Sequence, residues 1–178
     1  MATKTELSCA CGAFALELTG EPFITAECHC NSCREAGKRL DALPLARKML
    51  ASNDGTPFVL YRKDRVRLMK GQEHLAEFRL NAETPTRRVV TTCCRTPVFL
   101  EFKGGHWLSL YSALWPEGTA PAPSIRTMVS DRPAGNSLPD DLPSGPLVTA
   151  GFYARLLGAW IAMGFKSPEV TIPQTIEA

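Results

Sequence analysis

The segment Cys28-His29-Cys30-Asn31-Ser32-Cys33-Arg34 holds three of the chain's seven cysteines. The other four form two further groups, Cys9 with Cys11 and Cys93 with Cys94. Cysteines used only as small apolar core residues would scatter along the strands, whereas C-x-C and C-x-x-C spacing lets two thiolates from one turn reach a common ion. An odd number of cysteines without an export signal disfavours a disulfide framework. Metal ligation is therefore the leading prediction for these residues.

Composition and charge exclude several classes of protein. The 178 residues are enough to bury the core of one domain without disulfide or metal staples. Hydrophobic residues make up 44% and charged residues 21%, as in ordinary globular proteins. Lys and Arg total 20 against 18 Asp and Glu, a net charge of +2 that is far from the basic balance of a dedicated nucleic-acid binder. We expect no nucleic-acid partner.

The sequence predicts neither export nor a membrane span. No apolar run follows Lys4, so the N-terminus does not resemble a signal peptide. The longest apolar stretch, residues 150–165, contains Arg155 and falls short of the roughly 20 residues that a spanning helix needs. We expect a cytoplasmic protein.

Short stretches of alternating polar and apolar residues predict a core built from β-strands. Turns rich in Gly, Asn and Pro join these stretches, which favours antiparallel pairing. The predicted strands cover residues 13–18, 58–61, 66–69, 75–80, 88–91, 98–102 and 107–111. We expect residues 28–33 to form a loop. Residues 36–52 contain Pro44, which limits them to one or two broken helical turns.

The composition changes after residue 115, where Pro, Gly, Ser and Asp become frequent. We expect residues 1–115 to form a zinc-binding β-domain, and residues 116–178 to add an irregular connection and a C-terminal helix packed on that domain. Within the connection, only residues 125–129 resemble a strand. The helix is predicted over residues 149–165, with Thr149 as its N-cap. Its apolar arc is wide for a surface helix, so it could also join two copies of the chain in a homodimer.

Three cysteine motifs occur in an order that resembles a known family. They are Cys9-Ala10-Cys11-Gly12, the segment from Cys28 to Arg34, and Cys94-Arg95-Thr96-Pro97. Together they resemble the glutathione-dependent formaldehyde-activating enzyme family, which also includes centromere protein V. The resemblance implies a mainly β fold of coiled antiparallel sheets held by zinc. It also implies a carbon-sulfur lyase activity, in which glutathione sulfur adds to formaldehyde to give S-hydroxymethylglutathione.

The resemblance further implies two zinc sites. One is an open site, with one zinc position left for a substrate, and its ligands are Cys28, Cys30 and Cys33. The other is a closed structural site of four thiolates from the first and last cysteine groups. Three ligands of the closed site match the family: Cys9, Cys11 and Cys94.

The late cysteine group departs from the family's usual C-x-x-C-G motif. The first cysteine of that motif aligns with Thr91, and its glycine aligns with Arg95. Cys93 could supply the fourth thiolate instead. Adjacent residues in a strand point to opposite faces, so Cys93 and Cys94 can reach one ion only if the backbone kinks or bulges there. Otherwise water or another side chain completes the closed site, or the site is empty.

The chemistry of the open site follows from its ligand types. Three thiolates on Zn²⁺ leave one tetrahedral position for water or a substrate sulfur, which is typical of catalytic zinc. A thiol bound there loses its proton and becomes a nucleophile at neutral pH. Arg34, with Lys38 and Arg39 nearby, could balance the charge of the centre and bind the carboxylates of a thiol such as glutathione. Arg34 is the candidate substrate-binding residue, although a solvated or loop-tying arginine is the alternative.

Structural interpretations compete with these functional ones. The three cysteines of the open site could form a closed structural site or bind no metal. We expect His29 to point outward between its neighbouring cysteines, and His74 and His106 to lie at the surface or to be hydrogen-bonded in place. A run of basic residues predicts the solvent-exposed face of a strand: Arg62, Lys63, Arg65 and Arg67.

Two function classes therefore remain. The first is a zinc-dependent carbon-sulfur lyase that handles a small thiol, such as glutathione, and a small electrophile, such as formaldehyde. The second is a noncatalytic zinc-stapled β-domain that binds a partner through its surface or its C-terminal helix. The complete Cys28, Cys30 and Cys33 group favours the first class, and the altered segment from Thr91 to Arg95 favours the second.

Overall fold

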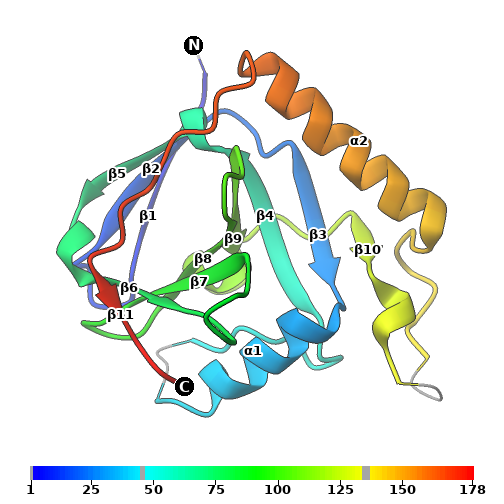
Figure 1. Ribbon diagram of the computed structural model, residues 1–178, viewed down its shortest axis with the longest axis horizontal. Coiled ribbons are helices and arrows are strands. Elements are labelled where there is room, and N and C mark those ends of the chain that lie inside the picture. The colour runs from blue at the N-terminus through cyan, green and yellow to red at the C-terminus, as the bar shows by residue number, and fades with distance from the viewer. Residues whose placement is uncertain (1, 45–46, 134–136) are drawn as a thin grey trace.

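The computed structural model describes residues 2–44, 47–133 and 137–178 and shows a mainly β protein with two sheets (Figure 1). The smaller sheet has the strand order β1-β2-β5, and the larger has the order β10-β3-β4-β9-β8-β7-β6-β11. The strands are β1 (Lys4–Ser8), β2 (Ala15–Thr19), β3 (Ile24–Cys28), β4 (Thr56–Arg62), β5 (Val66–Lys70), β6 (Leu75–Phe78), β7 (Thr86–Thr91), β8 (Pro97–Phe102), β9 (Trp107–Tyr111), β10 (Ile125–Thr127) and β11 (Gln174–Thr175). The two α-helices are α1 (Asn31–Asp41) and α2 (Pro146–Ala162).

The alternating pattern predicts antiparallel pairing. This prediction is confirmed for every pair formed among the strands numbered β1 to β9. The two short strands of the C-terminal region differ, because β10 runs parallel to β3 and β11 runs parallel to β6. These two strands form the two edges of the larger sheet. In Figure 1 the chain after α2 runs back across the molecule to reach β11 beside β6. The C-terminal region therefore extends the β-core at both edges.

The core consists of two apolar clusters on opposite faces of the larger sheet. Leu16 of the smaller sheet packs in the first cluster with Leu108 of β9. The neighbouring residues Val59 and Leu60 of β4 fall into different clusters, as alternating side chains of one strand should. The second cluster is covered in part by α1, which contributes Leu40. This second face also carries the candidate site.

Three strands, β1, β3 and β11, lie outside the segments that the sequence predicts. In β3 the alternating pattern is hidden, because Glu27 is buried although it is charged. The strand ends at Cys28, so the prediction that this cysteine lies in a loop is wrong. Cys28 is held by the hydrogen bonds of a sheet instead.

The prediction of a loop followed by one or two broken turns is also wrong for α1. This helix begins directly after Cys30, whose sulfur accepts a hydrogen bond from the Cys33 amide at 3.3 Å and so acts as the N-cap. Pro44 follows the end of the helix and does not interrupt it. Residues 45–46 of the predicted irregular stretch lie outside the described residues. The helix was not predicted, although its buried residues recur at helical spacing: Cys33, Ala36, Gly37 and Leu40.

The C-terminal helix is confirmed, but it begins three residues earlier than predicted. Gly145, not Thr149, holds the N-cap position, and Pro146 occupies the first turn, where its missing amide hydrogen is not needed. The helix buries Leu156 and Ala159 and leaves other apolar residues exposed, as its wide apolar arc indicates. The strand predicted over 125–129 is β10, and residues 134–136 of the connection lie outside the described residues.

The solvated face predicted for the basic segment 62–67 is wrong at Lys63. This residue begins a 3₁₀ turn rather than continuing a strand, and it is only 7% exposed. Its ammonium group pairs with the buried Glu101 carboxylate and donates to the Pro168 carbonyl at 2.8 Å. The Glu101 carboxylate is the partner that a buried charge needs, and the hydrogen bond to Pro168 links the β-core to the chain that follows α2.

Candidate metal centres

The first and last cysteine groups come together in the structure. Cys9 and Cys11 lie between β1 and β2, while Cys93 and Cys94 lie between β7 and β8. Their four sulfur atoms all lie within 4.8 Å of one another. The sulfur of Cys9 is 3.6 Å from that of Cys11 and 3.8 Å from that of Cys93. Thiolates about 2.3 Å from a tetrahedral zinc ion lie about 3.8 Å apart, so this cluster has the spacing that a four-thiolate centre needs.

Cys93 and Cys94 reach the same place because they lie in a turn. β7 ends at Thr91, so the rule that neighbours point to opposite faces does not apply, and the two sulfurs are 3.9 Å apart. The Thr91 hydroxyl accepts a hydrogen bond from the Thr96 amide at 3.0 Å. Arg95 adopts φ of 52°, in the left-handed region that glycine tolerates best. The turn therefore has a conformation suited to glycine, with an arginine in its place.

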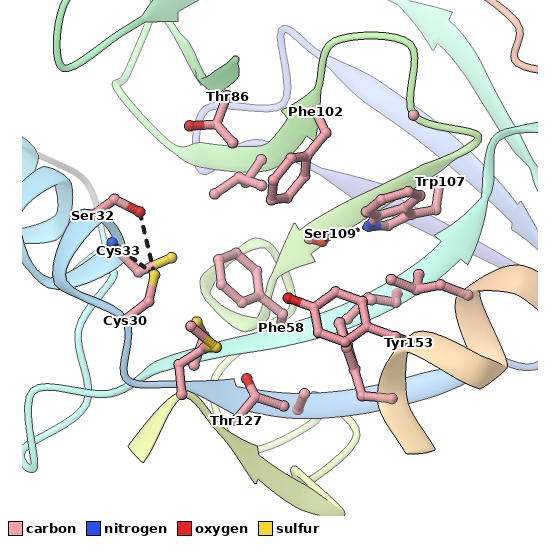
Figure 2. A pocket seen from close by; sticks show the side chains of 18 of the residues that line it. Cys30, Ser32, Cys33, Phe58, Thr86, Phe102, Trp107, Ser109, Thr127 and Tyr153 are labelled. Atoms are coloured by element: carbon pink, nitrogen blue, oxygen red, sulfur yellow. Dashed lines mark hydrogen bonds between the residues drawn. The ribbon is translucent and has the colours of Figure 1, made fainter. Parts of the chain in front are cut away.

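The second cluster is formed by Cys28, Cys30 and Cys33. Cys28 is the last residue of β3, Cys30 caps α1, and Cys33 lies in the first turn of that helix. Their sulfurs also lie within 4.8 Å of one another, and no fourth cysteine, histidine or carboxylate of the described residues joins them. Figure 2 shows Cys30 and Cys33 at one end of a pocket. This cluster is thus a three-thiol group that faces a cavity.

The proximity of the thiols changes their ionisation. Hydrogen bonds from the Cys28 and Cys33 thiols lower the pKa of Cys30 to about 2. The bond to Cys30 in turn raises the pKa of Cys28 to about 11, and the bonds to both neighbours raise the pKa of Cys33 well above its usual range. Without a cation, only one of the three ionises near neutral pH. Three thiolates can coexist here only when a positive ion binds between them.

The four-cysteine cluster shows the same competition between neighbours. Partial burial, together with the Cys11 and Cys9 thiols, raises the pKa of Cys93 to about 12. Burial acts in the same direction on Cys94, but hydrogen bonds from the Thr91 and Thr96 hydroxyls outweigh it and lower the pKa of Cys94 to about 5. Full ionisation of this cluster also requires a cation.

Arg88 is a buried arginine hydrogen-bonded to the segment that carries Cys30 and Cys33, and sequence analysis did not single it out. It is 1% exposed, and its guanidinium donates to the Ser32 carbonyl at 3.1 Å, between Cys30 and Cys33 in the chain. No carboxylate within the described ranges forms an ion pair with it. A buried charge without a partner is costly. We therefore expect thiolates bound to a metal ion here, which keep a net negative charge around a divalent ion, to supply the counter-charge of Arg88.

His29 does not point outward, so that prediction is wrong. The ring is fully buried, and its Nδ1 accepts a hydrogen bond from Arg132 at 2.9 Å while its Nε2 donates to Glu27 at 2.8 Å. Glu27 also accepts from Arg126 at 2.8 Å. The bond from His29, with those from Arg126 and Asn53, outweighs burial and lowers the pKa of Glu27 to about 2. Both ring nitrogens are used, so His29 orients the cysteine loop and does not ligate.

A cavity of about 920 Å³ extends from the three-cysteine cluster to α2. Figure 2 shows Phe58, Phe102 and Trp107 around it, with Tyr153 on the helix at the far end from Cys30. The hydroxyl groups that line the cavity belong to Ser32, Thr86, Ser109, Thr127, Thr149 and Tyr153. The four-cysteine cluster does not border the cavity. One cluster is therefore a closed set of ligands, and the other opens onto a space of ligand size.

The predicted substrate-binding residue Arg34 is not among the residues that line this cavity. Its guanidinium donates to the Asn31 side chain at 2.6 Å and to the Asp131 carbonyl at 2.9 Å, and so ties α1 to the segment after β10. Arg39 pairs with Glu35 on the same helix. The basic residue that does line the cavity, within the described part of the chain, is Lys103.

The other two histidines differ from each other. His74 is half-exposed and lies 3.7 Å from the Glu73 carboxylate. His106 is buried, lines the cavity, and its Nε2 donates to the Leu156 carbonyl of α2 at 2.8 Å. Burial lowers the pKa of His106, so the ring is neutral. His106 is therefore hydrogen-bonded in place, as expected. It also forms part of the wall of the cavity.

The fold and the two clusters define a class of mainly β protein whose cysteines could hold metal ions. A family model for the glutathione-dependent formaldehyde-activating enzyme matches residues 4–125, and the chain belongs to this family. No curated protein matches the chain. Among solved structures, the chain is similar to the crystal structure of a protein from Rhodobacter sphaeroides, with 17% identity, 66% of this chain and 92% of that chain covered, and a TM-score of 0.46.

Within the described residues, no helix has both the length and the apolar character that crossing a bilayer requires. α2, the longer of the two α-helices, has 17 residues.

Proposed function

We propose that Cys28, Cys30 and Cys33 bind one zinc ion whose fourth position opens to the cavity and receives a thiol. The observation that carries this proposal is the contrast in ligand number: three thiols border the cavity, whereas four thiols form the cluster away from it. Soft thiolates suit Zn²⁺, and three protein ligands with an open position are typical of catalytic zinc. Four cysteines are proposed to hold a second, structural zinc ion: Cys9, Cys11, Cys93 and Cys94.

The proposed reaction is that of a carbon-sulfur lyase of the S-(hydroxymethyl)glutathione synthase type. When bound, the zinc ion would lower the pKa of a thiol that coordinates it, so that the thiol ionises at neutral pH. The thiol releases its proton to solvent, and its sulfur attacks the carbonyl carbon of a small aldehyde such as formaldehyde. A carbon-sulfur bond forms, the π electrons of the carbonyl move to its oxygen, and that oxygen takes up a proton. The product is an S-hydroxymethyl adduct of the thiol.

Two hydroxyl groups can support the oxygen of the aldehyde. Thr86 lines the cavity and accepts a hydrogen bond from Arg88 at 3.2 Å, so its own proton is free to donate. Thr127 lines the cavity beside Cys28, its partner in the parallel pairing of β10 with β3. Donors placed where negative charge develops stabilise the transition state. These two groups are the proposed donors to the developing alkoxide.

The thiol is proposed to be a small molecule of the glutathione type, and the location is proposed to be the cytoplasm. Seven free cysteines fit a reducing compartment better than an oxidising one. For a thiol with carboxylates, Lys103 is the cation placed to meet it at the cavity, since the guanidinium of Arg34 is hydrogen-bonded elsewhere. No nucleic-acid partner is proposed.

The test combines metal analysis with turnover. Protein purified without added metal should contain two zinc ions per chain, and formaldehyde should consume thiol faster than in the spontaneous reaction. Cys30→Ser should lose one zinc ion and the rate above background. The control variant Ser8→Ala, in β1 and outside both clusters, should keep both. Full zinc content with no rate above background for any thiol would reject the catalytic assignment.

One observation favours a second candidate function, a noncatalytic interaction module that forms a homodimer. α2 leaves a stripe of apolar side chains at helical spacing exposed: Tyr153, Leu157, Ile161 and, just beyond the helix, Phe165. Such a stripe is typical of a helix that packs on a partner. Sedimentation analysis should show a dimer that Ile161→Lys dissociates. A monomer at all concentrations would reject the homodimer.

A further inference from the structure

The cavity beside Cys28, Cys30 and Cys33 is lined mainly by apolar side chains. Its aromatic residues are Phe58, Phe102, Trp107, Phe152, Tyr153 and Trp160. Of these, Phe102 and Trp107 stack on each other with ring centroids 5.5 Å apart. The volume of about 920 Å³ is in the range of cavities that enclose a ligand of drug size. The space is therefore much larger than formaldehyde needs.

α2 supplies one wall of this cavity. Phe152, Tyr153 and Leu156 come from the helix, and Trp160 follows one turn later. Trp160 stacks on His106, which in turn donates to the Leu156 carbonyl, so the helix is fixed to the β-core at the cavity. All of these helix residues lie outside residues 4–125, which the family model matches. The wall is thus a feature of this chain's C-terminal region.

The charges around the cavity do not suit a thiol with several charged groups. Only two charged residues of the described ranges line it, Lys103 and Asp131. Asp131 lies at the cysteine end, where its carboxylate accepts a hydrogen bond from the Asn31 amide at 3.3 Å. Lys103 is exposed, so a pair between its ammonium group and a carboxylate of the thiol is worth little. Burial of an unpaired carboxylate among aromatic rings is costly. Glutathione carries two carboxylates and one ammonium group.

We propose that this cavity takes a thiol whose body is an uncharged aromatic or similarly bulky apolar group, with its sulfur at the Cys28, Cys30 and Cys33 centre. The proposal rests on the proposed function for the sulfur position, and it places an apolar thiol ahead of glutathione as the ligand of this chain. The aromatic wall contributes most of the affinity, because burial of a phenyl-sized apolar surface is worth about a hundredfold in binding. α2 acts as the element that selects the substrate.

The test is a binding series on the full chain with cobalt in place of zinc. Sulfur binding is followed by the thiolate-to-cobalt absorption bands, with three simple thiols and glutathione as probes. 2-Phenylethanethiol should bind about a hundredfold more tightly than 2-mercaptoethanol. 3-Mercaptopropionate and glutathione should bind no more tightly than 2-mercaptoethanol, because their carboxylates gain nothing from the wall.

Variants of α2 test whether this helix causes the tighter binding of the aromatic thiol. Phe152→Ala should weaken binding of 2-phenylethanethiol about tenfold and leave that of 2-mercaptoethanol unchanged. Tyr153 is 57% exposed, so this position tolerates a charge. Tyr153→Lys should reduce the difference in affinity between 2-phenylethanethiol and 3-mercaptopropionate. Leu147→Ala is the control, since Leu147 is an exposed residue of α2 that lies outside both the cavity lining and the apolar stripe from Tyr153 to Phe165. It should change neither affinity.

A second readout separates this inference from the proposed function. Trp107 and Trp160 line the cavity, so their fluorescence should report 2-phenylethanol, which fills the cavity without a sulfur. If no thiol changes the cobalt bands but 2-phenylethanol still binds with sensitivity to Phe152→Ala, the sulfur site fails and the apolar cavity stands. Tighter binding of glutathione than of 2-phenylethanethiol, or equal effects of Phe152→Ala and Leu147→Ala, would overturn the proposal.

Discussion

The two cysteine clusters of this protein differ in the number of their thiols and in their place in the chain. The cluster of Cys9, Cys11, Cys93 and Cys94 has four thiols from two loops that are more than eighty residues apart in the chain. The cluster of Cys28, Cys30 and Cys33 has three thiols from one short segment and borders a cavity. A metal ion in the first cluster would hold distant chain segments together. In the second, as proposed, it would keep one ligand position free.

Metal removal should produce the largest effect, and it should act through the four-cysteine cluster. A structural zinc ion supplies on the order of 10 kcal/mol of folding free energy, which is comparable to the whole stability of a small domain. We expect a chelator to lower the melting temperature by tens of degrees or to abolish the cooperative transition, measured by calorimetry. An unchanged transition in protein shown to be metal-free would contradict a structural role for either cluster.

Single serine substitutions should separate the two clusters. Cys9→Ser removes a buried ligand that links two loops, and it should cost several kcal/mol in the free energy of unfolding, as loss of a metal site does. Cys30→Ser should cost about 1 kcal/mol, because serine is itself a favoured N-cap and preserves α1. Denaturant unfolding of both variants measures the difference. Equal losses would show that both clusters are structural.

Arg88→Met should reveal whether the three-cysteine cluster carries negative charge. If the thiolates are the counter-charge of this buried guanidinium, removal of the guanidinium should cost about 3 kcal/mol in the metal-loaded protein. The loss should shrink after chelation, when two of the three thiols are protonated. Arg67→Met is the control, since its pair with Glu17 is exposed to solvent and contributes little to stability. The same loss with and without metal would contradict the charge pairing.

The smallest effect concerns the turn that carries Cys93 and Cys94. Arg95 has a positive φ, so Arg95→Gly should raise the free energy of unfolding by about 0.5 to 1 kcal/mol. Arg65→Gly, in a 3₁₀ turn, should lower it by a similar amount. Thermal unfolding of the metal-loaded variants measures both. A destabilised Arg95→Gly would mean that the arginine side chain, and not the backbone, holds the turn.

Local signals allowed much of the β-core to be predicted. The alternating pattern correctly predicted β4, β5, β8 and β9. In each of these strands the two faces have different surroundings, so polar and apolar residues alternate. β3 was missed because Glu27 is buried in it, and α1 was missed because Pro44 weighed against a helix that ends before it. In both cases one polar or helix-breaking residue argued against the element in the sequence, whereas tertiary contacts stabilise that element in the structure.

The cysteine groups were found from spacing, but the residues around them were not. Arg88 and His29 are ordinary polar residues in the sequence, and only their burial shows that they need partners. The sequence offered Arg34 as the basic residue of the site because it follows Cys33 directly. The structure places that side chain against Asn31 and Asp131 instead. Adjacency in the chain does not determine where a helical side chain points.

The sequence alone determined the donor sets, since C-x-C and C-x-x-C spacing places thiolates within one turn of each other whatever the rest of the chain does. It also determined most strands and the C-terminal helix through their periodicity. The tertiary structure decided which distant groups meet. The packing of the smaller sheet against the larger one brings Cys9 to Cys93 and Cys94, and the packing of α2 closes the aromatic cavity beside Cys30. The physical reason is that spacing and periodicity act over a few residues. The meeting of distant segments depends on sheet register and on the burial of many side chains at once.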